Sequence, residues 1–206
     1  MKKLLLTMFA LAFLASCSTQ KSQPAPAEKP APKPVELETG RVAFQKMYIA
    51  ARGWARDAQP FRLQSQITAD SNGKDGKSAV WRADFASPAG RGVKPYIWSG
   101  TDASDAPGRG ISPGSEDNYN PSNSSTAVFD IAFLKVDSDQ ALATAQKHGG
   151  DKILEKSPDT PLLYILDWSQ ASNKLIWHVI YGSTREDAKL VVDIDGTSGD
   201  YIRTEK

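Results

Sequence analysis

The sequence predicts an α+β protein built from two tandem units, each a helix packed on a small antiparallel sheet, after a disordered N-terminal tether. Three observations support this fold class. A proline-rich stretch separates the N-terminus from the rest, two segments have the spacing or the caps of helices, and each is followed by three short apolar runs between turn residues. The expected boundaries are a signal peptide at 1–16, a tether at 17–39, a first unit at 40–100, a polar loop at 101–125 and a second unit at 126–206.

Residues 1–16 fit a secretory signal. Lys2 and Lys3 precede an apolar run of eleven residues, which is too short for a bilayer core that needs about 20 residues to cross. Small residues then precede Cys17, the single cysteine of the chain. This stretch resembles the lipobox of bacterial lipoproteins. The resemblance implies cleavage between Ser16 and Cys17 and attachment of a diacylglycerol to the Cys17 thiol. The alternative is a plain secretory signal with an incidental cysteine.

A lipidated Cys17 implies a location in the cell envelope. Two or more acyl chains anchor a protein firmly, whereas a single one binds only marginally. In such lipoproteins an Asp after the cysteine commonly retains the protein in the inner membrane. Ser18 stands there instead, so the resemblance favours the periplasmic face of the outer membrane in a Gram-negative cell.

The composition argues against nucleic acid as a partner. Removing residues 1–16 takes away two lysines and no acids, so the formal charge changes from +1 to −1. A chain with this balance has no electrostatic footprint for phosphate backbones.

Residues 21–40 hold five prolines between Pro24 and Pro34 and predict an extended spacer. A proline-rich ligand for an aromatic groove is the alternative for this segment.

The first unit starts near Gly40. Phe44, Met47, Tyr48 and Ala51 recur at helical spacing over 41–55. Strands are predicted at 61–69, 78–87 and 93–100, and Pro95 places the last of them at an edge or a bulge. Residues 101–125 contain almost nothing apolar and predict a long loop, either a linker or a functional loop.

The second unit repeats this order. We expect a strand at 127–136 and a helix at 137–150, capped by Asp137 or Ser138 and ended by Gly149. Further strands are predicted at 162–168, 174–182 and 188–196, with a last segment at 198–205. Setting 79–100 against 175–196 needs no gap at an offset of 96 residues, and this pairs Trp81 with Trp177. The shared order and the common offset predict a duplicated unit.

The second unit resembles a PepSY-like domain over residues 137–204. The matching positions are Trp177, Val179, Val192, Asp193, Thr197, Gly199 and Ile202, although this chain has one residue more between Asp193 and the glycine than is usual. The first unit keeps the tryptophan but lacks the acid. The resemblance implies a binding or inhibitory module with no chemistry of its own.

Some local patterns resemble catalytic or metal-binding motifs, but each has a better explanation. Ser112 in GISPG matches the elbow of serine hydrolases, but it lies in a polar loop without a preceding strand. His148 and His178 would need a carboxylate to hold zinc, and they fall in different units. Asp195 and Gly196 in DIDGTSGD are typical of a turn rather than a calcium loop. We therefore expect no metal, no cofactor and no catalytic residues.

The aromatic residues supply the candidate binding surface. Most tryptophans are expected in the core, and Trp177 should share a buried face with its alternate neighbours Leu175, Val179 and Tyr181. Trp98, beside Pro95 on the expected edge strand, is predicted to be exposed. The predicted surface comprises Tyr96, Trp98 and Tyr119. Its partner would be an envelope protein or peptide that the sequence does not identify, bound by a module that is not an enzyme. The alternatives are a small envelope hydrolase and a structural lipoprotein that aids assembly of a complex.

Overall fold

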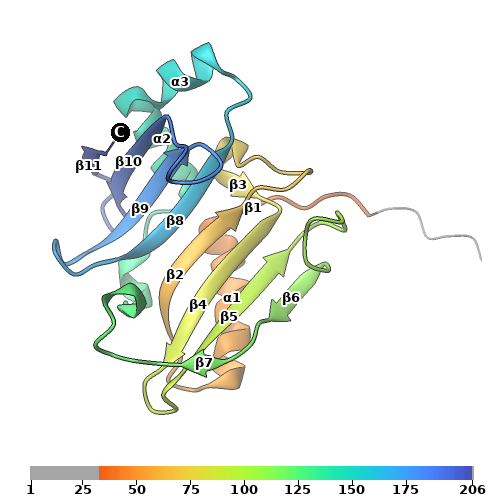
Figure 1. Cartoon of the computed structure of the whole chain (residues 1–206), viewed down its shortest axis with the longest axis vertical. Coiled ribbons are helices and arrows are strands. Elements are labelled where there is room, and N and C mark those ends of the chain that lie inside the picture. The colour runs from red at the N-terminus through yellow and green to blue at the C-terminus, as the bar shows by residue number, and fades with distance from the viewer. Residues whose placement is uncertain (1–32, 206) are drawn as a thin grey trace, which may run out of the picture. The chain divides into compact units, whose positions relative to one another are not determined.

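One antiparallel sheet of nine strands extends through the part of the chain that the structure describes, residues 33–205 (Figure 1). The structure is a computed structural model. The expected cleavage and lipidation sites, Ser16 and Cys17, lie outside the described residues. The strands are β1 Glu38–Thr39, β2 Gln59–Gln66, β3 Lys77–Ser78, β4 Val80–Ser87, β5 Gly92–Ser99, β6 Gly110–Pro113, β7 Asp117–Asn118, β8 Leu162–Ser169, β9 Lys174–Tyr181, β10 Leu190–Asp195 and β11 Tyr201–Thr204.

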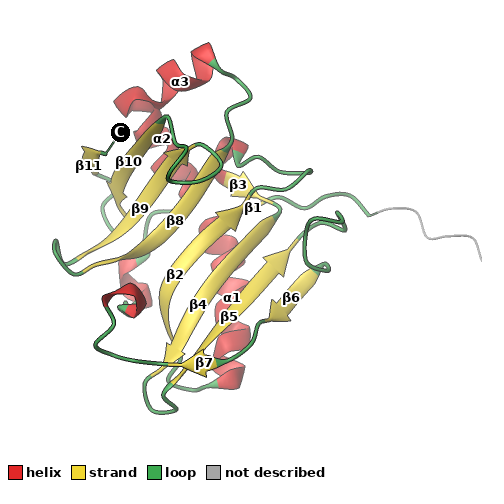
Figure 2. Ribbon diagram, in the orientation of Figure 1, coloured by secondary structure: helices red, strands yellow, loops and turns green. Residues whose placement is uncertain are grey.

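The helices are α1 Gly40–Trp54, α2 Ser138–Ala145 and α3 Asp151–Lys156, with a π-helical segment, η4 Gln146–Gly150, between the last two. In the view of Figure 2, α1 and α2 lie behind this sheet and α3 lies at its upper end. Short 3₁₀ turns are η1 Lys74–Gly76, η2 Ser124–Thr126 and η3 Ile131–Phe133. The expected α+β class is confirmed.

The strand order shows how the two halves meet. It is β11-β10-β9-β8-β2-β4-β5-β6, with β7 also pairing with β5, and β1 and β3 forming a separate two-stranded sheet. The first strands of the halves, β2 and β8, pair at three positions, including Leu63 opposite Leu166. The expectation of two separate small sheets is therefore wrong. Two separate sheets would leave β2 and β8 as exposed edge strands, and the pairing of β2 with β8 covers both edges.

The outer hairpins of the two halves have the same register. Trp81 lies opposite Trp98 in β4 and β5, and Trp177 lies opposite Ile194 in β9 and β10. Adding 96 to every pair from Val80–Ser99 to Phe85–Lys94 gives the pairs from Ile176–Asp195 to Tyr181–Leu190. The ungapped sequence alignment therefore matches the strand pairing position for position.

Trp81 and Trp177 lie at the centre of the core, as expected. Both side chains are fully buried, and their rings meet edge to face with centroids 6.4 Å apart. The Trp81 indole Nε1 donates to the carbonyl of Glu38, and the Trp177 Nε1 donates to the carbonyl of Val136. Each acceptor directly precedes the N-cap residue of a helix. The two tryptophans thus fix each helix to its own half of the sheet.

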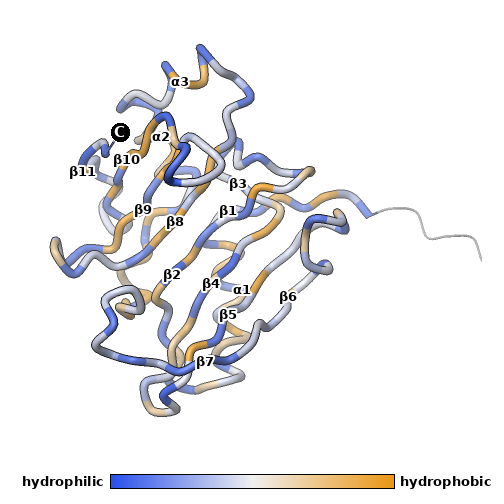
Figure 3. The backbone as a smooth tube through the Cα atoms, in the orientation of Figure 1, coloured by the Kyte–Doolittle hydropathy of each residue, from blue (hydrophilic) through white to orange (hydrophobic). Residues whose placement is uncertain are grey.

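Figure 3 shows hydrophobic and hydrophilic residues alternating along strands such as β4 and β5, as expected for a sheet with one buried face.

The N-termini of α1 and α2 converge on Asp137. The predicted cap is confirmed, because the Asp137 carboxylate accepts from the Ser138 N–H at 2.7 Å, and the Gln140 side chain completes a capping box. The same carboxylate accepts from the Arg41 N–H of α1 at 2.8 Å and from the Thr39 hydroxyl at 2.7 Å. Gly149 has a positive φ of 110°, but the chain continues through it into α3 instead of ending the helix there.

Two predicted segments differ from the structure. Residues 127–136 are not a strand, because the Asp130 side chain accepts from the Ala132 N–H and caps η3 in the middle of the segment. The expected loop at 101–125 contributes β6 and β7, which pair with β5. Pro95 is therefore not on an edge strand, and its carbonyl accepts from the Gly114 N–H at 2.8 Å.

Candidate functional site

The face of the sheet opposite the helices carries polar side chains. Among the described residues no helix covers this open face, and the loop between β9 and β10, residues 182–189, lies over one part of it (Figure 1). Its outward-facing residues include Arg62, Gln64, Arg82, Asp84 and Asp167. Beneath the loop a small apolar cluster comprises Leu163, Ile165, Ile180, Ala188 and Val191.

A large hollow on the open face lies where β2 and β8 separate. Their pairing ends at Gln64 and Ile165, and the Ser65 hydroxyl then accepts from the Tyr164 N–H at 3.0 Å in place of a strand partner. The resulting groove has a volume of about 700 Å³. We call it the central groove. It is lined by Arg62, Gln64, Ser65, Gln66, Ile67, Leu163, Ile165 and the loop residues Ser183, Thr184, Arg185 and Glu186.

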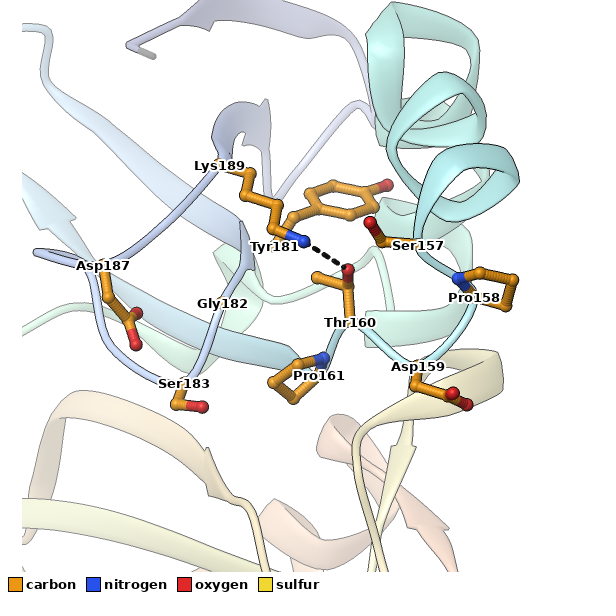
Figure 4. A pocket seen from close by; sticks show the side chains of 10 residues that line it. All are labelled: Ser157, Pro158, Asp159, Thr160, Pro161, Tyr181, Gly182, Ser183, Asp187 and Lys189. Carbon is orange, nitrogen blue, oxygen red and sulfur yellow. Dashed lines mark hydrogen bonds between the residues drawn. The ribbon is translucent and has the colours of Figure 1, made fainter.

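A second hollow lies on the other side of the same loop. It has a volume of about 390 Å³, and we call it the loop pocket (Figure 4). It is lined by Ser157, Pro158, Asp159, Thr160, Pro161, Tyr181, Gly182, Ser183, Asp187 and Lys189. Ser183 lines both hollows, so they are neighbours across the loop. The Asp187 carboxylate accepts from the Thr184 N–H at 2.7 Å and so fixes the shape of the loop.

Tyr181 forms one wall of the loop pocket with its ring. Its hydroxyl is buried on the side of Gly150 and has no hydrogen-bond partner within residues 33–205. Burial, with a smaller contribution from Asp151, raises the pKa of Tyr181 well above its ordinary value. This phenol therefore stays neutral and serves the core rather than proton transfer.

An ion-pair network lies beside the loop on the open face, around His178. The Nδ1 of His178 is 2.5 Å from an Asp193 carboxylate oxygen, and its Nε2 is 3.3 Å from an Asp167 oxygen. Burial alone would lower the pKa of His178, but the two carboxylates outweigh it and raise the pKa from 6.5 to about 9. Burial likewise opposes ionisation of Asp193, yet its bonds to His178 and Arg203 lower its pKa. His178 is therefore a cation at neutral pH.

The carboxylates of this network pair with cationic side chains of the protein itself. His178, Asp193 and Glu205 bring three potential ligand atoms within 4.8 Å of one another. Arg203 donates to Asp193 at 2.9 Å and to Glu205 at 2.7 Å, and Arg185 also pairs with Glu205. Each carboxylate thus already has a guanidinium or imidazolium partner. The geometry is that of a salt-bridge network whose centre, His178 and Asp193, is buried and whose arginines are more exposed.

The predicted aromatic surface is wrong in its main members. Tyr96 is 5% exposed and Trp98 is 4% exposed, and both lie on the helix-facing side of β5. The Lys46 ammonium of α1 lies over the Trp98 ring, 4.9 Å from its centroid. Because β6 and β7 cover β5, Trp98 is not at an edge. Tyr119 is partly exposed in a separate shallow hollow with Pro88 and Pro121.

The other candidate residues do not come together. Ser112 lies on β6 opposite Ile97, five strands away from His178 on β9, which corresponds to roughly 24 Å at ~4.8 Å per strand. His148 lies in η4 and stacks on the Tyr201 ring at 3.9 Å. The Asp195 carboxylate accepts from the Thr197 N–H and pairs with Lys174, as in a capped turn. None of these residues forms a hydrolase or zinc constellation within the described chain.

Comparison with known proteins shows the fold and no family. No protein-family model matches the chain, and no curated protein is similar to it. One solved structure, described as "a putative lipoprotein" from Clostridium difficile 630, superposes with a TM-score of 0.51 over 79% of this chain and 91% of that chain, at 10% sequence identity. At this identity the likeness concerns the fold alone. None of the helices within residues 33–205 has the length and apolar character needed to cross a bilayer.

Proposed function

We propose that this protein is a lipid-anchored component of the cell envelope that binds an extended polypeptide in the central groove, with no chemistry of its own. The observation that carries the proposal is the groove itself. Its volume of about 700 Å³ lies in the range of ligand sites. The envelope location rests on the lipobox-like residues around Cys17.

The lining of the groove suits a peptide backbone. Ile67, Leu163 and Ile165 offer apolar surface, and the Gln66 amide offers two donors and an acceptor. The Gln64 oxygen already accepts from Arg62, so Gln64 offers mainly its donors. An extended peptide presents side chains to alternate sides and backbone groups between them. Apolar contacts with amide groups beside them match that alternation. Addition of an extended segment to an unpaired strand is an established mode of peptide recognition, and β2 and β8 are unpaired with each other beyond Gln64 and Ile165.

The proposal includes a tandem, PepSY-like organisation. The 96-residue offset relates the registers of the outer hairpins, and the paired indole bonds of Trp81 and Trp177 relate the attachment of the helices. A duplicated unit explains both with one design. It also explains why the groove lies at the junction, because β2 and β8 are the equivalent first strands of the two halves and separate there. An inhibitory role would follow if the bound polypeptide were the active-site loop of an enzyme.

The experiment uses a display library of extended peptides selected on the immobilised full chain carrying Cys17→Ser. Selected peptides are then measured against two variants by calorimetry. Gln66→Trp fills the central groove, and Arg82→Trp places the same ring on the open face outside the groove. We expect binding to weaken at least tenfold for Gln66→Trp and to stay within twofold for Arg82→Trp. Equal binding by both variants, or the absence of any enriched peptide, would refute the proposal.

A further inference from the structure

Lys189 places a positive charge in the loop pocket that the described protein does not neutralise. Within residues 33–205 its ammonium forms no salt bridge, and its contact there is the Thr160 hydroxyl at 3.3 Å. Arg185 of the same loop, by contrast, pairs with Glu205. The Lys189 ammonium thus lines the pocket bound to a hydroxyl and to no carboxylate of the described residues.

Two hydroxyl groups lie beside this charge. Figure 4 shows Lys189 reaching from the start of β10 toward Thr160, with Ser157 beside them and Ser183 apart from them on the facing loop. Hydroxyl groups donate hydrogen bonds to an anion that a lysine attracts. Thr160 is only 5% exposed, so its hydroxyl is held in place by the surrounding chain. Lys189, Thr160 and Ser157 thus form a donor-rich end of the pocket with one positive charge.

Two carboxylates limit how much negative charge the pocket can take. Asp187 lines the rim, and its Oδ1 accepts from both the N–H and the hydroxyl of Thr184. Asp159 is exposed, and its carboxylate turns outward in Figure 4. With Asp159 and Asp187 the lining carries a formal charge of −1, but both carboxylates lie away from the Lys189 ammonium in Figure 4. Beside Lys189 a single negative charge is therefore favoured over a phosphate dianion, which the two acids would repel more strongly. The pocket therefore suits a carboxylate.

We propose that the loop pocket binds the C-terminal carboxylate of a peptide lying in the central groove. The proposal rests on the proposed function, because it takes the groove to hold a peptide. Lys189 pairs with the carboxylate, Thr160 and Ser157 donate hydrogen bonds to it, and Ser183 lies at the entrance from the groove. The Tyr181 ring packs beside the last residue. Ser183 belongs to both hollows, so a peptide that leaves the groove past this residue reaches the Lys189 ammonium.

The test titrates ¹⁵N-labelled full chain carrying Cys17→Ser with three probes: N-acetyl-alanyl-alanine, its C-terminal amide, and inorganic phosphate. We expect the free acid to shift the amide signals of Gly182 and Ser183 with saturation, and the C-terminal amide to bind about tenfold or more weakly, since a charge-assisted bond is lost. Lys189→Gln should abolish the preference for the acid, and Lys189→Arg should retain it. Lys152→Gln, the same change on the exposed surface of α3, is the control and should leave the preference intact.

Three outcomes would overturn the inference. The acid and the amide could bind with equal affinity, Lys189→Gln could keep the preference, or phosphate could bind more tightly than the acid. Failure here is distinct from failure of the groove proposal. If the selected peptides bind in the groove equally well as acids and as C-terminal amides, the groove function stands and the carboxylate assignment falls.

Discussion

Replacing Asp137 should destabilise both helices at once. The N-cap residue of α1, Thr39, makes no side-chain cap bond, and the Arg41 N–H of α1 is bound by the Asp137 carboxylate from 96 residues further along the chain. The same carboxylate caps α2 through Ser138. Loss of an N-cap costs about 0.5–2 kcal/mol, and a negative charge near a helix N-terminus contributes a further fraction. With two helices affected, Asp137→Ala should lower the free energy of unfolding by about 2–4 kcal/mol.

The assay is equilibrium urea unfolding followed by circular dichroism and tryptophan fluorescence, with the two probes compared. Asp137→Asn keeps one acceptor oxygen and should recover about half of the loss. Asp130→Ala removes a carboxylate that caps only the short turn η3, so it should cost less than about 1 kcal/mol. The double-cap interpretation is refuted if Asp137→Ala costs no more than Asp130→Ala. It is also refuted if the loss at Asp137 matches that of a single cap.

Three further expectations concern the core, the open face and the anchor. Trp81→Ala and Trp177→Ala remove fully buried rings and should each lower the free energy of unfolding by roughly 3–5 kcal/mol, measured by urea unfolding. Trp98→Ala should fall near the lower end of that range, and a near-neutral effect would contradict the buried position of Trp98. The pKa of His178 in the folded chain, about 9, exceeds its ordinary 6.5, so the imidazolium stabilises fully below about pH 6.5 and this stabilisation is lost as pH rises to 9. His178→Gln should therefore flatten the decline of unfolding free energy between pH 6.5 and 9, and an unchanged decline would exclude His178 as its source. Cys17→Ser should abolish incorporation of labelled palmitate and leave the signal uncleaved at that site, which a mass measurement would show; retained label and an unchanged mass would contradict the lipobox resemblance.

Local patterns in the sequence predicted local structure well. The alternation in β4 and β9 placed Trp81 and Trp177 on the buried face, and the capping residue Asp137 located the start of α2. Each of these features depends on residues within a few positions of one another. The pairing of β2 with β8 does not, because it joins residues about 100 positions apart and leaves no mark in either segment.

Most of the site could not be predicted from the sequence. Pro95 indicated an edge strand, and that inference wrongly placed Trp98 on the surface, because the polar segment after β5 folds back as β6. The loop around Ser183 resembled an ordinary turn. Only the fold brings it between residues of β2 and residues that precede β8 to form the two hollows. A free lysine such as Lys189 cannot be told from a paired one until its neighbours are known.

The three-residue junction between β2 and β8 has a consequence for the order of folding. Within each half, successive strands are joined by short connections, such as the one from Ser87 to Gly92, whereas the junction closes a loop of about 100 residues between Leu63 and Leu166. Loop closure costs more entropy as the loop lengthens, so both meanders should form before the halves associate. Association also brings Trp81 against Trp177, so the junction and the centre of the core should form in one late step. In kinetic terms, mutations at the junction should chiefly accelerate unfolding and leave the folding rate nearly unchanged if the junction forms after the transition state.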